Sequence, residues 1–289
     1  MKISLWCLNW YINGEGMKKL KVNRNIEKRL KKIDKLSQKI HRYFEAEDIH
    51  IFRMETKKLR AFLRLIGTDR FKGNKLVLPK HLKSLYRVLG AIRSLQLQQQ
   101  NISAAITEEG NGGMCKTYLN LLNAKAAGKM IKTESMLINK KALQKEMRRI
   151  AGAVPAKIGK SGIGKFIKTT GSRLQQLVNE GILSDESLHT LRKLLKDMLY
   201  CWSYIKADLA LSPAFPSKKD IRRIVDLLGD FRDIFMGIVQ LDSDYIYIED
   251  ESEHVLLLNI RTKWQQKKNE IKRQINTELP KLKFDLICI

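Results

Sequence analysis

Ile49-His50-Ile51-Phe52-Arg53-Met54-Glu55-Thr56-Lys57-Lys58-Leu59-Arg60 contains the pattern His-x-x-Arg-x-x-x-Lys, which recurs 139 positions later in Leu188-His189-Thr190-Leu191-Arg192-Lys193-Leu194-Leu195-Lys196. At the same spacing, Leu89-Gly90-Ala91-Ile92-Arg93 aligns with Leu228-Gly229-Asp230-Phe231-Arg232. Two motifs that recur at one unchanged distance indicate two copies of one structural unit. The sequence therefore predicts a duplicated helical module.

The first copy has helical periodicity, and its cations lie beside its apolar residues. The apolar stripe consists of Ile49, Phe52, Leu59, Leu63 and Ile66. A second stripe, about 100 degrees round the helix, consists of His50, Arg53, Lys57, Arg60 and Arg64. In the second copy, the residues that directly follow leucines are His189, Arg192 and Lys196, while Arg93 and Arg232 follow Ile92 and Phe231. Each repeated cation is therefore expected next to the buried seam of its helix.

The rest of the chain reads as further helices, because period-two alternation is confined to Tyr245–Ile248. The predicted fold is all-α, with two antiparallel four-helix bundles related by a pseudo-two-fold axis. The predicted segments are an extension at 1–16, a first repeat at 17–128, a linking helix and loop at 129–160, a second repeat at 161–276 and a tail at 277–289. Met17 is a second candidate for the translation start.

Two weaker patterns lie outside the main repeat. Leu121–Lys125 resembles Leu257–Arg261 at an offset of 136, which suggests equivalent fourth helices and adds Lys125 and Arg261 to the repeated cations. Gly159–Phe166 resembles a phosphate-binding loop, but Phe166 stands where Ser or Thr would hold magnesium and no strand precedes it. We interpret this segment as a flexible basic loop.

The charge balance indicates an anionic partner. The 289 residues include 55 Lys and Arg against 30 Asp and Glu, which gives a net charge of +25. This excess raises the local concentration of anions, so nucleic acid, polyphosphate or an acidic membrane surface would fit it. The four cysteines are scattered, and no segment reads as a signal peptide or a membrane span. We therefore expect a cytoplasmic protein.

The repeated residues are hydrogen-bond donors and do not form a catalytic set. Neither a carboxylate pair nor a Cys–His arrangement recurs, so no catalytic residue, metal site or cofactor is predicted. His50 and His189 are isolated from other ligand-type residues, and we expect them to face or shape an anion site. If the two motif helices face each other, their guanidinium and ammonium groups would line one cationic furrow suited to a linear polyanion.

These motifs, in this order and covering about residues 18–276, resemble the conserved histidine α-helical domain, abbreviated CHAD. The resemblance implies two four-helix bundles about a pseudo-two-fold axis and binding of inorganic polyphosphate in a basic central channel. It also implies phosphate-facing roles for His50, Arg53, Lys57, Arg60, Arg93, His189, Arg192, Lys196 and Arg232. Ser94 and Leu199 depart from the family pattern, where Asp and Arg are usual. The triphosphatase strand that accompanies many members is not found, so the chain looks like a stand-alone binding module associated with polyphosphate granules.

Two other functions stay open from the sequence. RNA or single-stranded DNA carries the same phosphate charge, although proteins that bind single strands add aromatic platforms for the bases. Aromatic residues make up only 7% here, and Tyr200 is the nearest one to the cationic stripes. Polyphosphate hydrolysis or transfer would require a carboxylate cluster to hold a metal ion. The expected function is therefore non-enzymatic binding.

Overall fold

The computed structural model describes residues 17–68, 76–108, 115–134, 136, 140–154, 157–158, 160–181, 183–208, 215–282 and 284. This part of the chain is all-α, as predicted, apart from short 3-10 turns and one pair of two-residue strands. The main helices are α2 (Lys19–Tyr43), α3 (Ala46–Gly67), α4 (Lys80–Glu108), α5 (Lys116–Glu134), α6 (Lys140–Ala153), α7 (Lys160–Asn179), α8 (Asp185–Asp208), α9 (Lys218–Asp244) and α10 (Glu251–Glu278). The strands β1 (Met17–Lys18) and β2 (Lys157–Ile158) pair antiparallel, and the 3-10 turns are η1 (Tyr245–Tyr247) and η2 (Leu279–Lys281).

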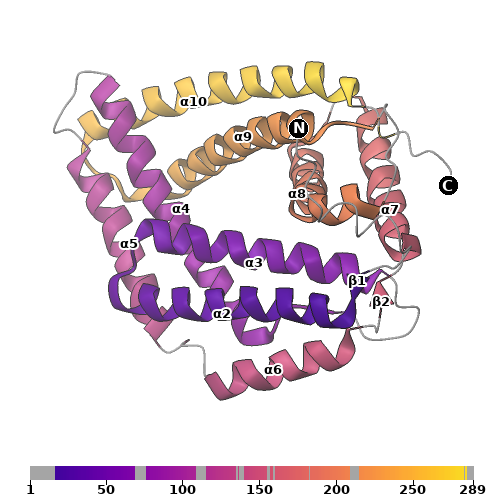
Figure 1. Cartoon of the computed structure of the whole chain (residues 1–289). Helices are drawn as coiled ribbons and strands as arrows, with labels where there is room; N and C mark the ends of the chain where they lie inside the picture. Colours follow the sequence, from indigo (N-terminus) through magenta and orange to yellow (C-terminus); the bar gives the residue numbers. More distant parts are fainter. Residues whose placement is uncertain are drawn as a thin grey trace, which may run out of the picture.

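The helices of each half contact one another in the same order (Figure 1). In the first half, α2 packs on α3, α3 on α4 and α4 on α5; in the second, α7 packs on α8, α8 on α9 and α9 on α10. The halves meet where α3 contacts α8 and where α4 contacts α9. The two motif helices are therefore direct neighbours.

Equivalent residues of α3 and α8, and of α4 and α9, have matching environments. Phe52 and Leu191 are both buried, as are Leu89 and Leu228. The Gln98 amide, at position 98, donates a hydrogen bond of 3.2 Å to the carbonyl of Gly237, its equivalent 139 positions later. Equivalent groups that touch each other are expected beside a two-fold axis, although the axis itself stays a prediction.

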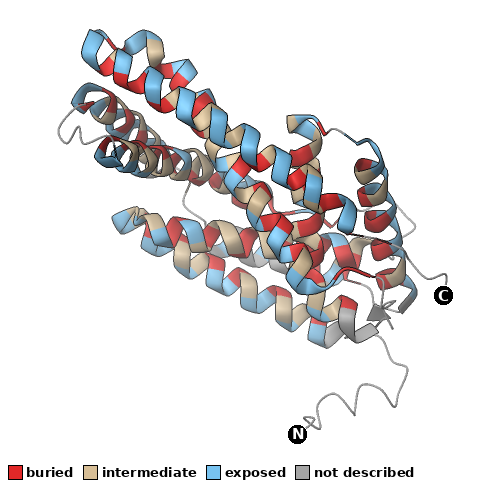
Figure 2. Ribbon diagram, turned by 90° about the horizontal axis from the view of Figure 1, so that it is seen from above, coloured by how far each residue is buried: buried red, intermediate tan, exposed pale blue. Residues whose placement is uncertain are grey.

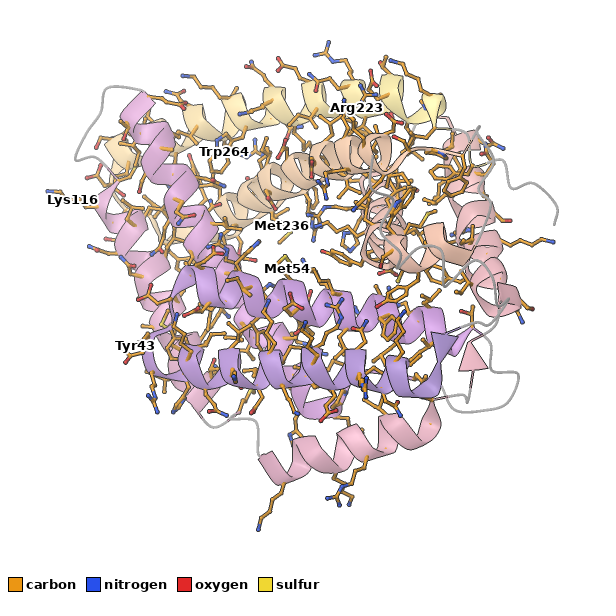
Figure 3. The ribbon with its side chains drawn as sticks, viewed as in Figure 1. Tyr43, Met54, Lys116, Arg223, Met236 and Trp264 are labelled. Atoms are coloured by element: carbon orange, nitrogen blue, oxygen red, sulfur yellow. The ribbon has the colours of Figure 1, made fainter. Side chains whose placement is uncertain are left out.

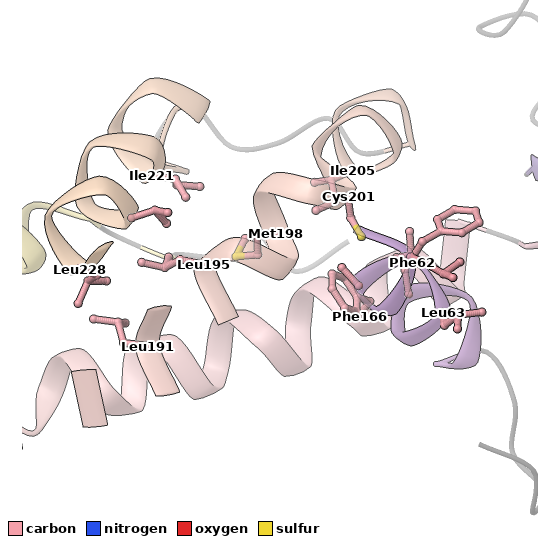
Figure 4. Close-up of a cluster of buried hydrophobic side chains, with 14 of the residues drawn as sticks. Phe62, Leu63, Phe166, Leu191, Leu195, Met198, Cys201, Ile205, Ile221 and Leu228 are labelled. Carbon is pink, nitrogen blue, oxygen red and sulfur yellow. The ribbon is translucent and has the colours of Figure 1, made fainter. Parts of the chain in front are cut away.

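The hydrophobic residues form two cores, and each core draws on both halves. The larger core contains α2, α3, α7 and α8 together with the first part of α4 and of α9. Figure 4 shows Phe62 and Leu63 of α3 beside Phe166 of α7 and Cys201 of α8. The smaller core joins the later part of α4 and α5 to the end of α9 and the first part of α10. Buried residues lie on the inward faces of these helices (Figure 2), so the two halves share their interiors.

Two expectations from the sequence are corrected. Ser161 to Phe166 are not a flexible loop, because α7 begins at Lys160 and buries Ile163 and Phe166. The alignment of α5 with α10 at an offset of 136 also fails, because Leu122 is fully buried whereas its aligned residue Leu258 is 46% exposed.

The ends of the predicted segments can be placed only in part. Residues 1–16 lie outside the described residues, as do the last five of the chain. Within the predicted tail, Leu282 and Phe284 are buried, and the Phe284 ring meets Phe215 edge-on at 6.2 Å. The tail therefore adds to the larger core. Among the described helices, none combines the length and hydropathy needed to cross a bilayer.

Candidate anion-binding site

The repeated cations of four helices, together with Arg60, lie within electrostatic range of one another and form one cluster. Its members, which we call the cationic cluster, are Arg53, Lys57 and Arg60 on α3, Arg93 on α4, Arg192 and Lys196 on α8, and Arg232 on α9. All seven are half-buried, since each follows or flanks a buried seam. None makes an ion pair within 4.0 Å with a carboxylate of the described residues. Half-buried charges usually find partners, so a cluster without them has free capacity for an external anion.

The two motif lysines have strongly altered acidity. Burial, followed by the charges of Lys196, Arg53, Arg192 and Arg60, lowers the pKa of Lys57 to about 7. Burial and Arg192 lower the pKa of Lys196 to about 8, although Asp233 and Asp226 act in the opposite direction. Lys57 and Lys196 are equivalent residues of the two copies and lie within electrostatic range of each other. The centre of the cluster is therefore the place where added negative charge would be stabilised most.

The glycine of the Leu-Gly-x-x-Arg motif makes room for the arginine of the other motif. A Cβ atom at Gly90 would lie 2.2 Å from Nη1 of Arg53, and one at Gly229 would lie 3.6 Å from Nη2 of Arg192. Arg53 Nη1 donates a hydrogen bond of 2.9 Å to the Tyr86 carbonyl, and its guanidinium lies 4.5 Å from the centre of the Tyr86 ring. The two motifs therefore act together: the glycine of Leu-Gly-x-x-Arg leaves the space that the arginine side chain of His-x-x-Arg-x-x-x-Lys occupies.

Three buried polar atoms at the site have no hydrogen-bond partner within the described chain. Nε of Arg93 and Nε of Arg192 are donors, and Nδ1 of His189 is a donor or an acceptor according to the tautomer. An unsatisfied buried donor costs about 1–3 kcal/mol, so such groups favour an acceptor when one is supplied. Phosphate oxygens are acceptors of this kind.

The two motif histidines flank the cluster and carry lowered pKa values. Desolvation of the ring is the first cause for both, and nearby cations add to it: Arg93, Lys57 and Lys196 for His50, and Arg232, Lys193 and Arg192 for His189. Glu47 and Glu186 oppose these shifts. Both rings are therefore neutral at pH 7, and each offers one N–H donor and one acceptor.

Three of the predicted cations lie elsewhere. Arg64 is exposed and pairs with Asp197 of α8 at the edge of the α3–α8 contact. Lys125 pairs with the fully buried Asp244 at 2.5 Å, and Arg261 pairs with Asp242 at 2.5 Å. The structure therefore does not bring Lys125 and Arg261 into the cationic cluster, since their partners lie at the end of α9.

The structure adds residues that the sequence motifs did not indicate. Tyr86 of α4 contacts two cluster members, with the Arg60 guanidinium 5.3 Å from its ring centre in addition to Arg53. The centre of the Phe235 ring of α9 lies 5.4 Å from the Arg232 guanidinium and 5.5 Å from the amine of Lys268 of α10. These aromatics do not recur at the repeat spacing, so no pattern could have identified them.

A cavity meets the cationic cluster at one member, Arg60. Met54 of α3 and Met236 of α9 point toward one another in the middle of the molecule (Figure 3). A cavity of about 690 Å³ adjoins Arg60 and is lined by Arg64, Lys80, Lys83 and apolar residues of α3 and of 76–78. Within the described chain, no group of three or more His, Cys, Asp or Glu is placed to hold a metal ion. The geometry supports anion binding by hydrogen bonds and charge.

Comparisons with known proteins agree with this architecture. A crystal structure of the CHAD domain from the plant Ricinus communis is similar, with a TM-score of 0.68 at 14% identity, covering 93% of this chain and 93% of that one. PptA from Streptomyces chartreusis is similar with a TM-score of 0.63 at 13% identity, covering 91% of this chain and 98% of that one. No curated protein matches the sequence significantly. The CHAD domain family model matches residues 24–241, and the chain therefore belongs to the CHAD domain family.

Proposed function

We propose that this protein binds inorganic polyphosphate, without catalysing a reaction, in the cationic cluster between α3, α4, α8 and α9. The observation that carries this proposal is the cluster itself: seven half-buried cations from both halves, none paired with a described carboxylate. A ligand that contacts α3 and α8 at once would offset the mutual repulsion of Lys57 and Lys196.

A linear phosphate polymer fits this arrangement better than a nucleic acid does. Arginine forks bind phosphate oxygens in pairs, and the cluster offers five of them with two lysines. Bases would need free aromatic faces. Arg53 and Arg60 both lie over the Tyr86 ring, so this aromatic residue already has cationic partners.

The direct test replaces Arg53, Lys57, Arg192 and Lys196 together with alanine. We expect binding of long-chain polyphosphate to fall by at least 100-fold, since four phosphate contacts are lost, while circular dichroism shows unchanged helical content. The matched control replaces the exposed residues Arg24, Lys28, Lys35 and Arg42 of α2, which removes the same charge. An equal loss of affinity in both variants would mean that net charge, and not the cluster, binds the polymer.

Salt and competition identify the ligand class. Affinity for polyphosphate should fall steeply with salt, because counterions are released when several phosphates are neutralised. Labelled polyphosphate should be displaced by unlabelled polyphosphate at lower phosphate concentration than by single-stranded RNA. Preferential displacement by RNA would instead favour nucleic acid as the partner.

Two further expectations belong to this proposal. Incubation with polyphosphate and magnesium or manganese should release no phosphate, because the site offers donors and no group to hold a metal ion. A fluorescent fusion should concentrate at cytoplasmic polyphosphate granules, and the four-alanine variant should be diffuse. Phosphate release by wild-type protein that the four-alanine variant lacks would indicate an enzyme.

A further inference from the structure

We propose that the Lys57 side chain is a site of covalent acylation by acyl phosphates, whose phosphate group binds among the guanidinium groups around it. The inference rests on the proposed phosphate-binding role of the cationic cluster. It adds a modification that would regulate that role.

The position of Lys57 provides the two requirements of the reaction. Its amine makes no ion pair with a described carboxylate, and it is half-buried at the contact of α3 with α8. The guanidinium groups of Arg53 and Arg60 on α3 and of Arg192 on α8 lie within electrostatic range. The other charged groups that face it are His50 on α3, Lys196 on α8 and Asp233 on α9. The site thus combines an unpaired amine with an anion-binding surface.

The electrostatics of the site make the amine nucleophilic. A desolvated lysine beside other cations is activated because its neutral form is populated near pH 7. With a pKa of about 7, about half of the Lys57 amine is neutral at pH 7, compared with roughly 1 part in 10³ or less for an ordinary lysine.

Neighbouring lysines lack this combination. Lys58 follows Lys57 in sequence but pairs with the buried Glu55 carboxylate at 3.1 Å. Lys196 is the equivalent of Lys57 in the second copy, but Asp233 and Asp226 stabilise its charged form, so its pKa is about 8. We therefore expect acylation to be fastest at Lys57, slower at Lys196 and slowest at Lys58.

The reaction balances without a further reagent. The neutral Lys57 nitrogen attacks the acyl carbon, so an N–C bond forms and the C–O bond to phosphate breaks. Inorganic phosphate leaves with the electron pair, stabilised by the surrounding guanidinium groups, and the proton released from nitrogen passes to phosphate or solvent. The product is an uncharged amide at the centre of the cluster, which weakens polyanion binding.

The experiment uses the full chain with acetyl phosphate at pH 7.5 and follows acetylation by peptide mass spectrometry. We expect Lys57 to react at least tenfold faster than Lys58 and several-fold faster than Lys196. A rate at Lys57 no greater than at Lys58 would overturn the proposal. The Arg192→Gln variant should acetylate Lys57 several-fold more slowly, because phosphate docking is weakened and the amine becomes more basic. An unchanged rate in this variant would also overturn it.

A second acyl donor separates docking from nucleophilicity. The N-hydroxysuccinimide ester of acetic acid carries no phosphate, so tripolyphosphate should slow acetylation by acetyl phosphate at least fivefold more than acetylation by this ester. Equal inhibition of both donors would rule out phosphate docking. Polyphosphate binding by untreated protein, measured in parallel, tests the proposed function independently. Treatment with acetyl phosphate should weaken polyphosphate binding by wild-type protein at least fivefold, whereas the affinity of Lys57→Arg should be the same before and after treatment. An equal loss in both proteins would place the effect at another residue.

Discussion

Lys57 and Lys196 occupy the same place in the two copies of one motif, yet their neighbours give them different acidity. Lys57 lies among arginines and has a pKa of about 7, whereas Asp233 and Asp226 hold the pKa of Lys196 nearer to 8. Residue identity and helical position are equal, and burial is the first cause of both shifts, so the two pKa values reflect how deeply each amine is buried and which charges surround it. The two lowered pKa values place the titration of the cationic cluster near neutral pH.

Polyphosphate affinity should therefore rise as the pH falls from 9 to 7. Both lysines gain protons over this range, and the ammonium forms bind phosphate more strongly. We expect an increase of about tenfold, equivalent to ~1.4 kcal/mol, in titrations at constant ionic strength. The double variant Lys57→Arg, Lys196→Arg should lose most of this dependence because guanidinium stays charged. A pH profile that is the same in both proteins would contradict the assignment.

The two motif glycines should differ in their tolerance of alanine. In Gly90→Ala the new methyl group would displace the Arg53 guanidinium from the Tyr86 carbonyl, so polyphosphate binding should weaken by about 3- to 30-fold. Gly229→Ala leaves ordinary contact with Arg192 at 3.6 Å and should bind as the wild type does. Titrations of both variants, with melting curves to confirm folding, test this. Equal affinities for the two variants would refute the supporting role of Gly90.

At the scale of elements, close approach between helices depends on a few small or polar residues. Gly237 of α9 lies where a Cβ would be 2.8 Å from the Trp264 ring of α10 and 3.1 Å from Oε1 of Gln98 of α4. Glu253 of α10 accepts hydrogen bonds from the backbone N–H groups of Thr117 and Tyr118, at 2.9 and 3.2 Å, and so caps α5 of the other half. The smaller core is thus joined by specific contacts between elements far apart in sequence.

Gly237→Ala should destabilise the fold by about 1–3 kcal/mol, because the methyl group meets a rigid ring and the better helix propensity of alanine offsets only about 1 kcal/mol. Gly128→Ala is the matched control, since no atom lies within 4 Å of its Cβ position on α5. This control should be neutral or more stable by up to about 1 kcal/mol. Urea denaturation measures both free energies of unfolding. Similar values for the two variants would show that α9 and α10 can move apart without cost.

At the scale of the whole molecule, a net charge of +25 opposes folding, and the cationic cluster concentrates part of that cost in one place. The two halves share two cores, so the proposed ligand between α3 and α8 should stabilise the whole fold and not one separable unit. Stability should accordingly respond both to ligand and to proton concentration.

Without ligand, the free energy of unfolding should rise between pH 7 and pH 8.5. The folded-state pKa values of Lys57 and Lys196 lie below those of the unfolded chain, so the unfolded state binds more protons in this range. As pH falls, the native state therefore loses stability relative to the unfolded state. The expected gain is roughly 1–2 kcal/mol. Urea titrations at both pH values measure it. Lys57→Met should remove more than half of the increase, and an unchanged increase would place its origin elsewhere.

The sequence by itself determined the all-α class and the buried face of each motif helix, because a 3.6-residue period fixes which side chains lie together. The apolar stripe predicted for α3 is buried at each of its five positions from Ile49 to Ile66. The family followed from motif order and spacing. These features depend on local geometry, which neighbouring residues encode.

Only the tertiary structure decided which cations meet and which are neutralised. Lys125 and Arg261 have the same charge as the cluster residues, but Asp244 and Asp242 approach them through the folding of α9, and no local pattern encodes that approach. Packing between helices likewise decides the ring contacts of Tyr86 and Phe235 with the cations and the close approach of Arg53 to Gly90. Burial and neighbouring charge set the pKa of Lys57, and both are properties of the packed molecule.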